Sequence, residues 1–408
     1  MKCRHCNAPL TLPLIDLGCA PPSNAYLSRQ QLPQPEKKYP LRVLVCQTCW
    51  LAQTEDFAQA HELFDADYAY FSSFSSTWLE HANRYTNEMS SRFHLNSSSH
   101  VVEIAANDGY LLQYFKSANI PCTGVEPTAS TAAAARAKDI HIVQEFFGVA
   151  LANILVTQGK QADLTAANNV LAHVPDINDF VAGFTVLLKP SGVATFEFPH
   201  LMQLVALNQF DTIYHEHFSY LSLTAVQRIF AANGLIIFDV EEHPTHGGSL
   251  RVFAQRADTG KQPVRDPVAK IIHEEESIGV QTEKYYLAFQ ARAEKVKDDF
   301  VNFLSGARQR GQTVAAYGAA AKGNTLMNFA KLGADLIRYV VDKNPAKQGK
   351  FMPGSHIPIV SPEALQSQRP DYLVILPWNI ADEVKQQNAA LAKLGTQFVT
   401  AVPKLEIA

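Results

Sequence analysis

The stretch Val101-Val102-Glu103-Ile104-Ala105-Ala106-Asn107-Asp108-Gly109-Tyr110-Leu111-Leu112 decides the fold of this chain. It begins with the apolar pattern of a buried strand, continues as a turn of small and polar residues, and ends in the start of a helix. Strand, small-residue turn and helix form the phosphate or nucleoside cradle of a doubly wound sheet. The turn has one glycine where a dinucleotide-binding turn has three. Because those glycines bring backbone close to a pyrophosphate, the turn favours a nucleoside without phosphates.

The segments that follow continue the pattern of a doubly wound sheet. A second strand ends at Glu126, where a carboxylate can accept both hydroxyls of a ribose. A third strand, residues 162–166, runs into a polar segment that contains Asn168 and His173. Three further elements follow in order, namely a helix over 180–188, a break at 189–192 and a strand over 193–198.

A pair of strands closes the edge of this sheet. Residues 234–240 and 248–255 have strand patterns and flank a short turn, which predicts an antiparallel hairpin. Gly247-Gly248 either forms that turn or brings backbone N–H groups to a substrate, and we favour the turn.

The stretch Tyr214-His215-Glu216-His217 gathers ionisable side chains in an apolar neighbourhood. Imidazole titrates near pH ~6.5 and phenol near ~10, so the combination suits proton transfer. Two other interpretations stay open. Ser222 is a good N-cap for an apolar-periodic helix over 223–232, so the stretch can be a loop whose polar groups only hydrogen-bond, and His-x-His can ligate a metal.

Two tight cysteine pairs, Cys3-x-x-Cys6 and Cys46-x-x-Cys49, predict a metal site near the N-terminus. Each pair can bring both sulfurs to one tetrahedral Zn²⁺. A redox Cys-x-x-Cys is the rival interpretation, but it does not need the second pair. Because four protein ligands leave no open position for water, we expect this zinc to be structural, with binding free energy on the order of 10 kcal/mol.

A linker rich in tyrosine and serine follows the cysteine region. Its residues 65–73 include Tyr68 and Tyr70 and are poor in helix formers. Exposed phenols here can cover a pocket, or the aromatic rings can pack the N-terminal module onto the next domain. A helical pattern over 78–93 comes next and is broken by the polar residues 96–99.

The C-terminal third repeats the strand, turn and helix pattern. Residues 267–304 predict one long helix, ended by Gly306 and Gly311. A strand over 314–317, a small-residue turn containing Lys322, and further strands over 336–341 and 371–376 then indicate a second Rossmann-type unit. The turn can hold phosphate through backbone N–H groups and one cation, or the unit can serve packing alone.

Composition excludes several classes of protein. The chain has 408 residues, which suggests two or three domains. A net charge of -4 with mixed signs argues against a nucleic-acid binder, and no apolar run approaches the ~20 residues of a membrane span. No apolar h-region follows the N-terminus, so we expect a cytoplasmic protein. We also expect a monomer, because no repeated exposed apolar face stands out.

These patterns carry two resemblances. The central region resembles class I S-adenosylmethionine-dependent methyltransferases. The whole chain resembles the sugar C-methyltransferases that act on nucleotide-linked 4-ketohexoses, through the cysteine module, the loop 103–111, the Tyr-His-Glu-His stretch and the turn 316–325. Ala316 stands at the first position of that turn, where the family has glycine. The resemblance implies an α/β fold in three parts, namely a zinc module (1–62), a Rossmann-like methyltransferase domain (63–260) and a linker helix with a second Rossmann-like domain (261–408).

The resemblance also implies roles for individual residues. The active site is expected to contain Tyr214, Glu216 and His217, faced by His173 and by Tyr68 or Tyr70. We assign His217 as the base, oriented by Glu216, with Tyr214 or His173 donating to the oxygen of an enolate.

Two further sets of residues are expected to bind ligands. Those expected to contact S-adenosylmethionine are Glu103, Ala105, Asn107, Asp108, Gly109, Glu126 and Asn168, with the ribose on Glu126 and the amino-acid end at Gly109. Those expected to contact the nucleotide-linked sugar are Tyr70, Lys322, Asn324, Trp378 and Asn379.

The implied chemistry is methylation of carbon. A ketone at C4 of the sugar makes the C3 proton acidic, a base removes it, and the enolate carbon takes the methyl group of the sulfonium. Three alternatives stay open: a methyltransferase acting on oxygen or nitrogen, a nucleotide-sugar oxidoreductase, and a zinc-dependent binding protein without catalytic activity. The missing glycines disfavour the oxidoreductase.

Overall fold

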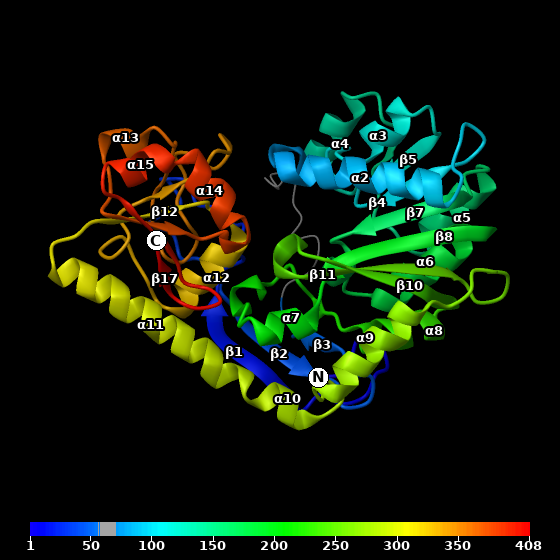
Figure 1. The fold of residues 1–408 in the computed structure, drawn as a ribbon, viewed down its shortest axis with the longest axis horizontal. Coiled ribbons are helices and arrows are strands. Elements are labelled where there is room, and N and C mark those ends of the chain that lie inside the picture. Colours follow the sequence, from blue (N-terminus) through cyan, green and yellow to red (C-terminus); the bar gives the residue numbers. More distant parts are fainter. Residues whose placement is uncertain (56, 58–70) are drawn as a thin grey trace.

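The computed structural model describes residues 1–55, 57 and 71–408. Within these ranges the strands form three sheets, of four, seven and six strands. Two α/β lobes stand side by side, and the N-terminal strands and the long helix α11 run beneath them (Figure 1). The expected class of fold, an α/β domain with a Rossmann-like sheet and a second α/β domain, is confirmed.

The seven-stranded sheet has the order β10-β11-β8-β7-β4-β5-β6. Strands β8, β7, β4, β5 and β6 are parallel, and β10 with β11 forms the predicted antiparallel edge pair. Its strands are β4 (Val101–Ile104), β5 (Cys122–Val125), β6 (Ile142–Val143), β7 (Ala162–Asn168), β8 (Leu188–Pro199), β10 (Leu235–His243) and β11 (Ser249–Arg256). The break expected at 189–192 is instead an irregularity within β8, where the pairing with β7 shifts from Ala162↔Leu188 to Leu164↔Val193.

Helices cover this sheet and carry its loops. They are α2 (Ser76–Arg92), α3 (Leu112–Ser117), α4 (Ala129–Arg136), α5 (Val149–Thr157), α6 (Ile177–Leu187), α7 (Leu201–Ala206) and α8 (Leu223–Ala232), with short 3-10 turns η1 (Ser72–Phe74), η2 (Leu171–His173), η3 (Phe210–Thr212) and η4 (Thr245–Gly247). Helix α8 begins where its N-cap was predicted, because the Ser222 side chain accepts a hydrogen bond from the backbone N–H of Ala225. Gly247 lies in the turn η4 between β10 and β11, as we favoured.

The four-stranded sheet joins segments far apart in sequence. Its order is β1-β2-β3-β9, with β1 (Leu12–Ala20), β2 (Tyr39–Val45) and β3 (Ala52–Thr54) from the N-terminal region. The fourth strand, β9 (Ser219–Tyr220), directly follows the Tyr-His-Glu-His stretch and pairs with β3. This pairing ties the candidate catalytic loop to the cysteine module.

The six-stranded sheet has the order β14-β13-β12-β15-β16-β17. Its strands are β12 (Val314–Tyr317), β13 (Val340–Val341), β14 (Ile359–Val360), β15 (Tyr372–Ile375), β16 (Gln397–Thr400) and β17 (Glu406–Ile407), and its helical segments are α12 (Ala321–Phe329), α13 (Ala364–Ser367), η5 (Trp378–Ile380), α14 (Ala381–Gln387) and α15 (Ala389–Lys393). The strand expected over 336–341 is shorter than predicted, because Leu336 and Ile337 bond back to Gly333 in a turn.

The single helix predicted over 267–304 is wrong. The chain forms α9 (Asp266–Ser277), α10 (Glu283–Leu287) and α11 (Phe289–Gln309) instead. Gly279, at φ 89°, ends the first of these, and Gly306 lies inside α11 rather than ending it. Among the helices of the described ranges, none is long and apolar enough to cross a membrane.

One apolar core connects the N-terminal module with the C-terminal lobe. Val43 of β2, Phe210 of η3, Phe300 of α11 and Val340 of β13 are fully buried in the same cluster. The seven-stranded sheet is buried mainly in two other clusters. The N-terminal module and the C-terminal lobe therefore pack as neighbours although they lie at opposite ends of the sequence.

Candidate active site

His217 lies in the loop between η3 and β9, and its hydrogen bond fixes its tautomer. Its Nδ1 is 2.9 Å from the carbonyl oxygen of Thr212. A carbonyl can only accept, so Nδ1 carries the hydrogen and Nε2 of the neutral ring keeps a lone pair. Burial, and then the neighbouring His173, hold the pKa of His217 well below its usual range. The arrangement is that of a neutral imidazole able to accept a proton at Nε2.

Two side chains flank this imidazole. The ring of Tyr214 lies 3.9 Å from the His217 ring, between centroids, and the ring of His173 lies 4.6 Å from it on edge. His173, at the end of η2, donates from Nδ1 to the backbone carbonyl of Glu216 at 2.7 Å. Burial lowers the pKa of His173 to about 4, so this ring is also neutral near pH 7. The predicted residues Tyr214, His173 and His217 therefore come together.

Glu216 has a different position from the one expected. Its side chain is 1% exposed, and its Oε1 accepts a hydrogen bond from Nδ2 of Asn24 at 3.1 Å. Burial raises the pKa of Glu216 to about 7. The assignment of Glu216 as the group that orients His217 is corrected by these contacts, because the carbonyl of Thr212 does so. Sequence reasoning missed this because a backbone carbonyl leaves no mark in the side-chain pattern.

The other histidine of the stretch does not form a His-x-His metal site with His217. His215 Nε2 lies 3.3 Å from the carbonyl oxygen of Tyr39, so its ring bonds to the start of β2. Among the described residues, the group with metal-ligating geometry is the predicted set Cys3, Cys6, Cys46 and Cys49, whose sulfurs all lie within 4.8 Å of one another. Such a cluster of four thiols fits a structural Zn²⁺.

The turn after β4 has the backbone of a ligand cradle. Ala105, Asn107 and Gly109 have φ values of 59°, 50° and 76°. A Cβ on Gly109 would come within 2.4 Å of the Ile140 Cδ1, so only glycine fits there without displacement of its neighbour. Glu103 lies within β4, just before this turn, and is fully buried. Burial raises its pKa well above the usual range.

Glu126 closes this cradle from the end of β5. Its Oε2 accepts from the backbone N–H of Asn107 at 3.0 Å and its Oε1 from the N–H of Thr128 at 2.9 Å. A carboxylate can accept further hydrogen bonds, so these contacts leave room for ribose hydroxyls. Asp108 Oδ1 and Asn169 Oδ1 are buried with no partner among the described residues. Acceptors without partners at the carboxyl ends of β4 and β7 fit a ligand that carries hydroxyl and ammonium donors. S-adenosylmethionine carries both.

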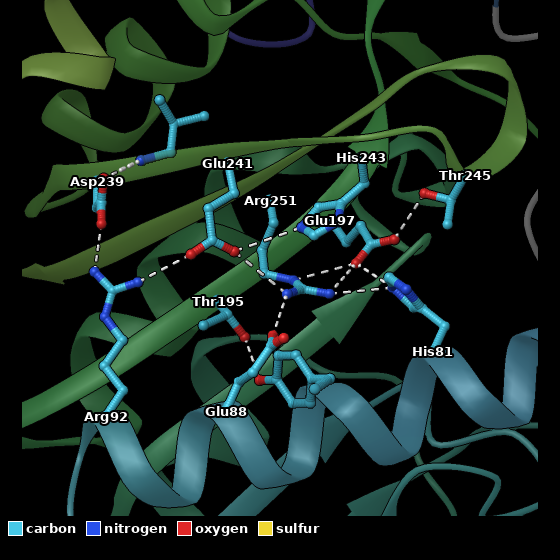
Figure 2. Close-up of polar contacts among 12 residues, drawn as sticks. His81, Glu88, Arg92, Thr195, Glu197, Asp239, Glu241, His243, Thr245 and Arg251 are labelled. Carbon is cyan, nitrogen blue, oxygen red and sulfur yellow. Dashed lines mark hydrogen bonds and ion pairs between the residues drawn. The ribbon is translucent and has the colours of Figure 1, made fainter.

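A buried polar network supports the neighbouring hairpin (Figure 2). Glu197 of β8 is 2.8 Å from His81 Nε2, accepts from Arg251 Nη2 at 2.9 Å, and accepts from Thr245 Oγ1 at 3.0 Å. Burial alone would raise the pKa of Glu197, but the His81 hydrogen bond and the Arg251 charge outweigh it and hold the pKa at about 2. This network anchors η4 to helix α2. A glutamate and an arginine inside apolar strand patterns are the signal that could have predicted it.

His246 in η4 is a site residue that sequence reasoning missed. It has φ 55°, a rare conformation for a residue with a side chain. Its Nε2 is 3.3 Å from Nδ2 of Asn169, which can only donate, so the ring accepts there. Trp78 lies 5.3 Å away, between ring centroids. His246 therefore lies near the ends of β7 and β4.

The C-terminal residues expected to bind substrate contact protein groups from other parts of the chain. Lys322, in the first turn of α12, donates to Asn379 Oδ1 at 2.7 Å and lies 4.5 Å from the centre of the Trp378 ring. Trp378 donates to Asp211 of η3. Asn324 is 1% exposed and donates to the backbone carbonyl of Ser23 at 2.6 Å. Of the predicted set, Trp378 thus contacts the lobe of the seven-stranded sheet directly, and Lys322 lies against the Trp378 ring.

Two of the predicted residues fall outside the described ranges. Tyr68 and Tyr70, predicted to face the active site, belong to the segment 58–70. Asn168, predicted to contact the cofactor, is the last residue of β7 and lies beside Asn169 at the same edge of the sheet as Glu126.

Comparison with known proteins gives three matches to domain families. Residues 3–64 match the family described as "Putative zinc binding domain", residues 78–239 match "Methyltransferase domain", and residues 244–403 match "C-methyltransferase C-terminal domain". Over 403 residues the chain is 34% identical to "C-methyltransferase NovU" of Streptomyces niveus, covering 99% of this chain and 96% of that protein.

Solved structures give weaker likenesses. Magnesium protoporphyrin IX methyltransferase of Synechocystis PCC 6803 is 14% identical, covers 44% of this chain and 83% of its own, and has a TM-score of 0.36. An S-adenosylmethionine-dependent methyltransferase of Clostridium acetobutylicum ATCC 824 is 11% identical, covers 44% of this chain and 92% of its own, and also has a TM-score of 0.36. Likenesses this weak support no functional conclusion.

Proposed function

Since this chain belongs to the family of C-methyltransferases with a zinc-binding domain and a C-terminal domain, we propose that it methylates C3 of a nucleotide-linked 4-keto-deoxysugar. The enzyme is an S-adenosylmethionine-dependent methyltransferase. The proposal concerns the sugar substrate, the carbon that is methylated and the residues of the site. They rest on the geometry around His217 and on the arrangement of the two lobes.

The cradle after β4 would hold the cofactor. When bound, S-adenosylmethionine supplies an electrophilic methyl group. Glu126 would accept hydrogen bonds from the ribose hydroxyls, and the backbone at Gly109 would approach the amino-acid end, with Asn107 and Asp108 close by. The Asp108 oxygen without a partner is an acceptor suited to the ammonium group.

His217 would remove the proton from C3 of the sugar. The pair of electrons of the C–H bond passes into an enolate, and the proton goes to Nε2 of His217. The C3–CH₃ bond then forms as the bond between sulfur and methyl breaks. Tyr214 or His173 would donate to the enolate oxygen, and one donor aimed at developing charge contributes about 3 kcal/mol. The neutral ring of His173 carries its hydrogen on Nδ1, which is bonded to a carbonyl, so its Nε2 has no hydrogen to donate to the enolate oxygen. Tyr214 is therefore the better donor.

The C-terminal lobe would bind the nucleotide of the sugar. Lys322 lies at the start of α12, directly after a small-residue turn, where backbone N–H groups and one cation suit a phosphate. Asn379 would contribute a further polar contact beside Lys322. We also propose that the enzyme acts as a monomer in the cytoplasm.

One observation carries the assignment of the base. His217 is neutral, its Nδ1–H is fixed by the Thr212 carbonyl, and its other nitrogen is an acceptor beside Tyr214 and His173. A carbon acid next to a ketone needs such a base, whereas methyl transfer to an amine does not need removal of a carbon-bound proton.

The test measures exchange of the C3 proton of dTDP-linked 4-keto-6-deoxyhexoses in deuterated water, with S-adenosylhomocysteine bound. We expect wild-type enzyme to exchange the proton, and His217→Ala to lose exchange by about 10²-fold or more. His273→Ala, which alters an exposed histidine of α9, is the matched control and should exchange at the wild-type rate. Exchange that survives His217→Ala would overturn the assignment of the base.

Isotope transfer separates the proposal from its alternative. With ¹³C-methyl-labelled S-adenosylmethionine, the new methyl group should couple to a sugar carbon in the NMR spectrum. A label bonded to oxygen or nitrogen would replace the proposed reaction with O- or N-methylation.

A further inference from the structure

Two side chains of the C-terminal lobe donate hydrogen bonds to the segment that precedes His217. Trp378 Nε1 donates to Asp211 Oδ2 at 2.7 Å. Thr325 Oγ1 donates to the backbone carbonyl of Ile213 at 2.8 Å. We call these four residues the interdomain latch. Their sequence separations of 167 and 112 positions show that two distant segments meet at this one loop.

The two loop residues of the latch, Asp211 and Ile213, flank the residue whose carbonyl orients His217. The carbonyl that accepts from His217 Nδ1 belongs to Thr212, which lies between the two residues that the C-terminal lobe holds. A shift of η3 would move that carbonyl, and the imidazole would move with it. We propose that Trp378 and Thr325 are positioning residues for His217, so that the C-terminal lobe sets the geometry of the base in addition to binding substrate. The proposal rests on the proposed function of His217.

Asp211, Ile213 and Thr325 of the latch are buried and Trp378 is partly buried, so water competes little for these hydrogen bonds. Asp211 is 1% exposed and Thr325 is 3% exposed. A hydrogen bond to a buried carboxylate is roughly twice as strong as one between neutral groups. Oδ1 of Asp211 is already buried without a partner among the described residues, so breaking this bond would leave both oxygens of the carboxylate unpaired, which is costly. Thermal motion of η3 against the C-terminal lobe is thereby restricted.

The hairpin of the methyltransferase lobe confines the same indole. Gly247 in η4 has φ 90°, and a Cβ there would lie 2.4 Å from Trp378 Cη2. Gln209 Nε2 donates to the Gly247 carbonyl at 2.7 Å. The missing side chain at this glycine therefore makes room for Trp378 between η4 and η3.

The latch also brings a cation near the base. Lys322 lies 4.5 Å from the centre of the Trp378 ring. Its charge is among the influences that lower the pKa of His217, after burial, His173 and His246. A correctly placed C-terminal lobe therefore favours the neutral imidazole that a base requires.

The test compares variants that remove one hydrogen bond each. Trp378→Phe keeps an aromatic ring without the N–H donor, and Thr325→Val keeps the shape without the hydroxyl. In protein labelled with ¹⁵N-histidine, we expect the Nδ1–H signal of His217, assigned from its absence in His217→Gln, to shift or broaden in both variants. We expect kcat to fall about tenfold or more, with the KM for S-adenosylmethionine within twofold of wild type.

Two controls separate positioning from a loss of folding. Thr157→Val removes a hydroxyl that donates to a carbonyl in α5 at 2.7 Å, far from the latch in sequence, and should leave the His217 signal and kcat unchanged. Asp211→Asn keeps an acceptor for the Trp378 N–H and should retain more activity than Trp378→Phe. Calorimetric binding of S-adenosylhomocysteine verifies that each variant is folded.

The outcomes are distinct. An unchanged His217 signal with unchanged kcat in Trp378→Phe and Thr325→Val would overturn the latch and leave the base assignment standing. If instead His217→Ala retains exchange of the C3 proton, the proposed function fails, whatever the two latch variants do.

Discussion

The two α/β lobes contain the same turn and use it differently. In the methyltransferase lobe the Glu126 carboxylate, at the end of the second strand, accepts from the backbone N–H of Asn107 in the first turn at 3.0 Å. In the C-terminal lobe Asp342, directly after β13, accepts at 2.7 Å from the N–H of Ala319, which lies in the corresponding turn after β12, called the second turn below. In each lobe, an acid after the second strand thus fixes the turn that follows the first strand.

The difference lies in what covers each turn. Tyr26 and Lys347 donate to the carbonyl of Ala319, at 2.6 and 2.8 Å, so protein groups from the N-terminal module and the lobe itself cover the second turn. The first turn instead retains the buried Asp108 acceptor without a partner among the described residues. The carbonyl of Ala319 in the C-terminal lobe therefore takes contacts between domains, whereas the turn after β4 keeps an acceptor for the proposed cofactor.

Removal of zinc should have the largest effect on the difference between the two lobes. Cys46→Ser, or a chelator, removes binding free energy on the order of 10 kcal/mol and should disorder the module that covers the second turn. We expect dTDP binding, measured by calorimetry, to be lost while S-adenosylhomocysteine still binds. Cys122→Ser, outside the cluster, is the control. Loss of both ligands together would show that the lobes do not respond separately.

The two acids are expected to have different effects on ligand binding. Glu126→Gln should weaken S-adenosylhomocysteine about 10- to 100-fold, since charge-assisted hydrogen bonds contribute about 1.5–3 kcal/mol. Asp342→Asn should leave that affinity within twofold, because it fixes the other turn. Titration calorimetry of both variants decides, and equal losses would remove the distinction between the turns.

The glycines of the turns should show a smaller, structural effect. Gly109→Ala meets Ile140 in the cofactor cradle, and Gly318→Ala meets Pro377, next to Trp378, at 2.6 Å. Both have positive φ, so each should lose about 1–3 kcal/mol of unfolding free energy in urea. Only Gly109→Ala should also weaken cofactor binding, while Gly318→Ala should perturb the His217 signal. The reverse pattern would contradict the roles given to the two turns.

The smallest expected effect concerns pH and the histidines of the candidate active site. Burial lowers the pKa of His173 to about 4, burial with the Lys322 charge lowers that of His246 to about 4, and burial holds that of His217 well below its usual range. Between pH ~6.5 and 4 the unfolded chain therefore binds more protons than the folded chain, and stability falls as the pH falls. Glu216, with its pKa raised to about 7 by burial, acts in the opposite direction between pH ~7 and 4.5.

Urea unfolding at pH 7, 5.5 and 4.5 measures the balance. The histidine rings are partly accessible to solvent, so each contributes less than the ~1.4 kcal/mol that a pKa shift of one unit is worth when fully expressed. We expect the free energy of unfolding to fall by about 1–2 kcal/mol in all between pH 7 and 4.5. His173→Gln should flatten the dependence. A dependence that is unchanged in this variant would show that other groups cause the acid sensitivity.

Local patterns predicted much of the fold. The strands Val101–Ile104 and Val314–Tyr317 and the helix Leu223–Ala232 have the predicted bounds, because their apolar periodicity and caps are local properties. The long helix failed at Gly279, where one left-handed residue outweighs the periodicity on either side. The cysteine cluster was predictable from spacing alone.

The candidate site was predicted in part. The sequence brought attention to Tyr214 and His217, because ionisable side chains in an apolar context are conspicuous, and the family resemblance added His173. It did not reveal His246, whose position depends on the hairpin and its network, nor the carbonyl of Thr212 that orients the base.

The sequence by itself determined the types of element, the four zinc ligands and the turn that ends β4, since each depends on residues that are neighbours in the chain. Only the tertiary structure decided that β9 joins the N-terminal sheet and that Trp378 reaches Asp211. Contacts of this kind arise when packed surfaces bring distant segments together. They follow from the shape and burial of whole lobes, which no local pattern of residues encodes.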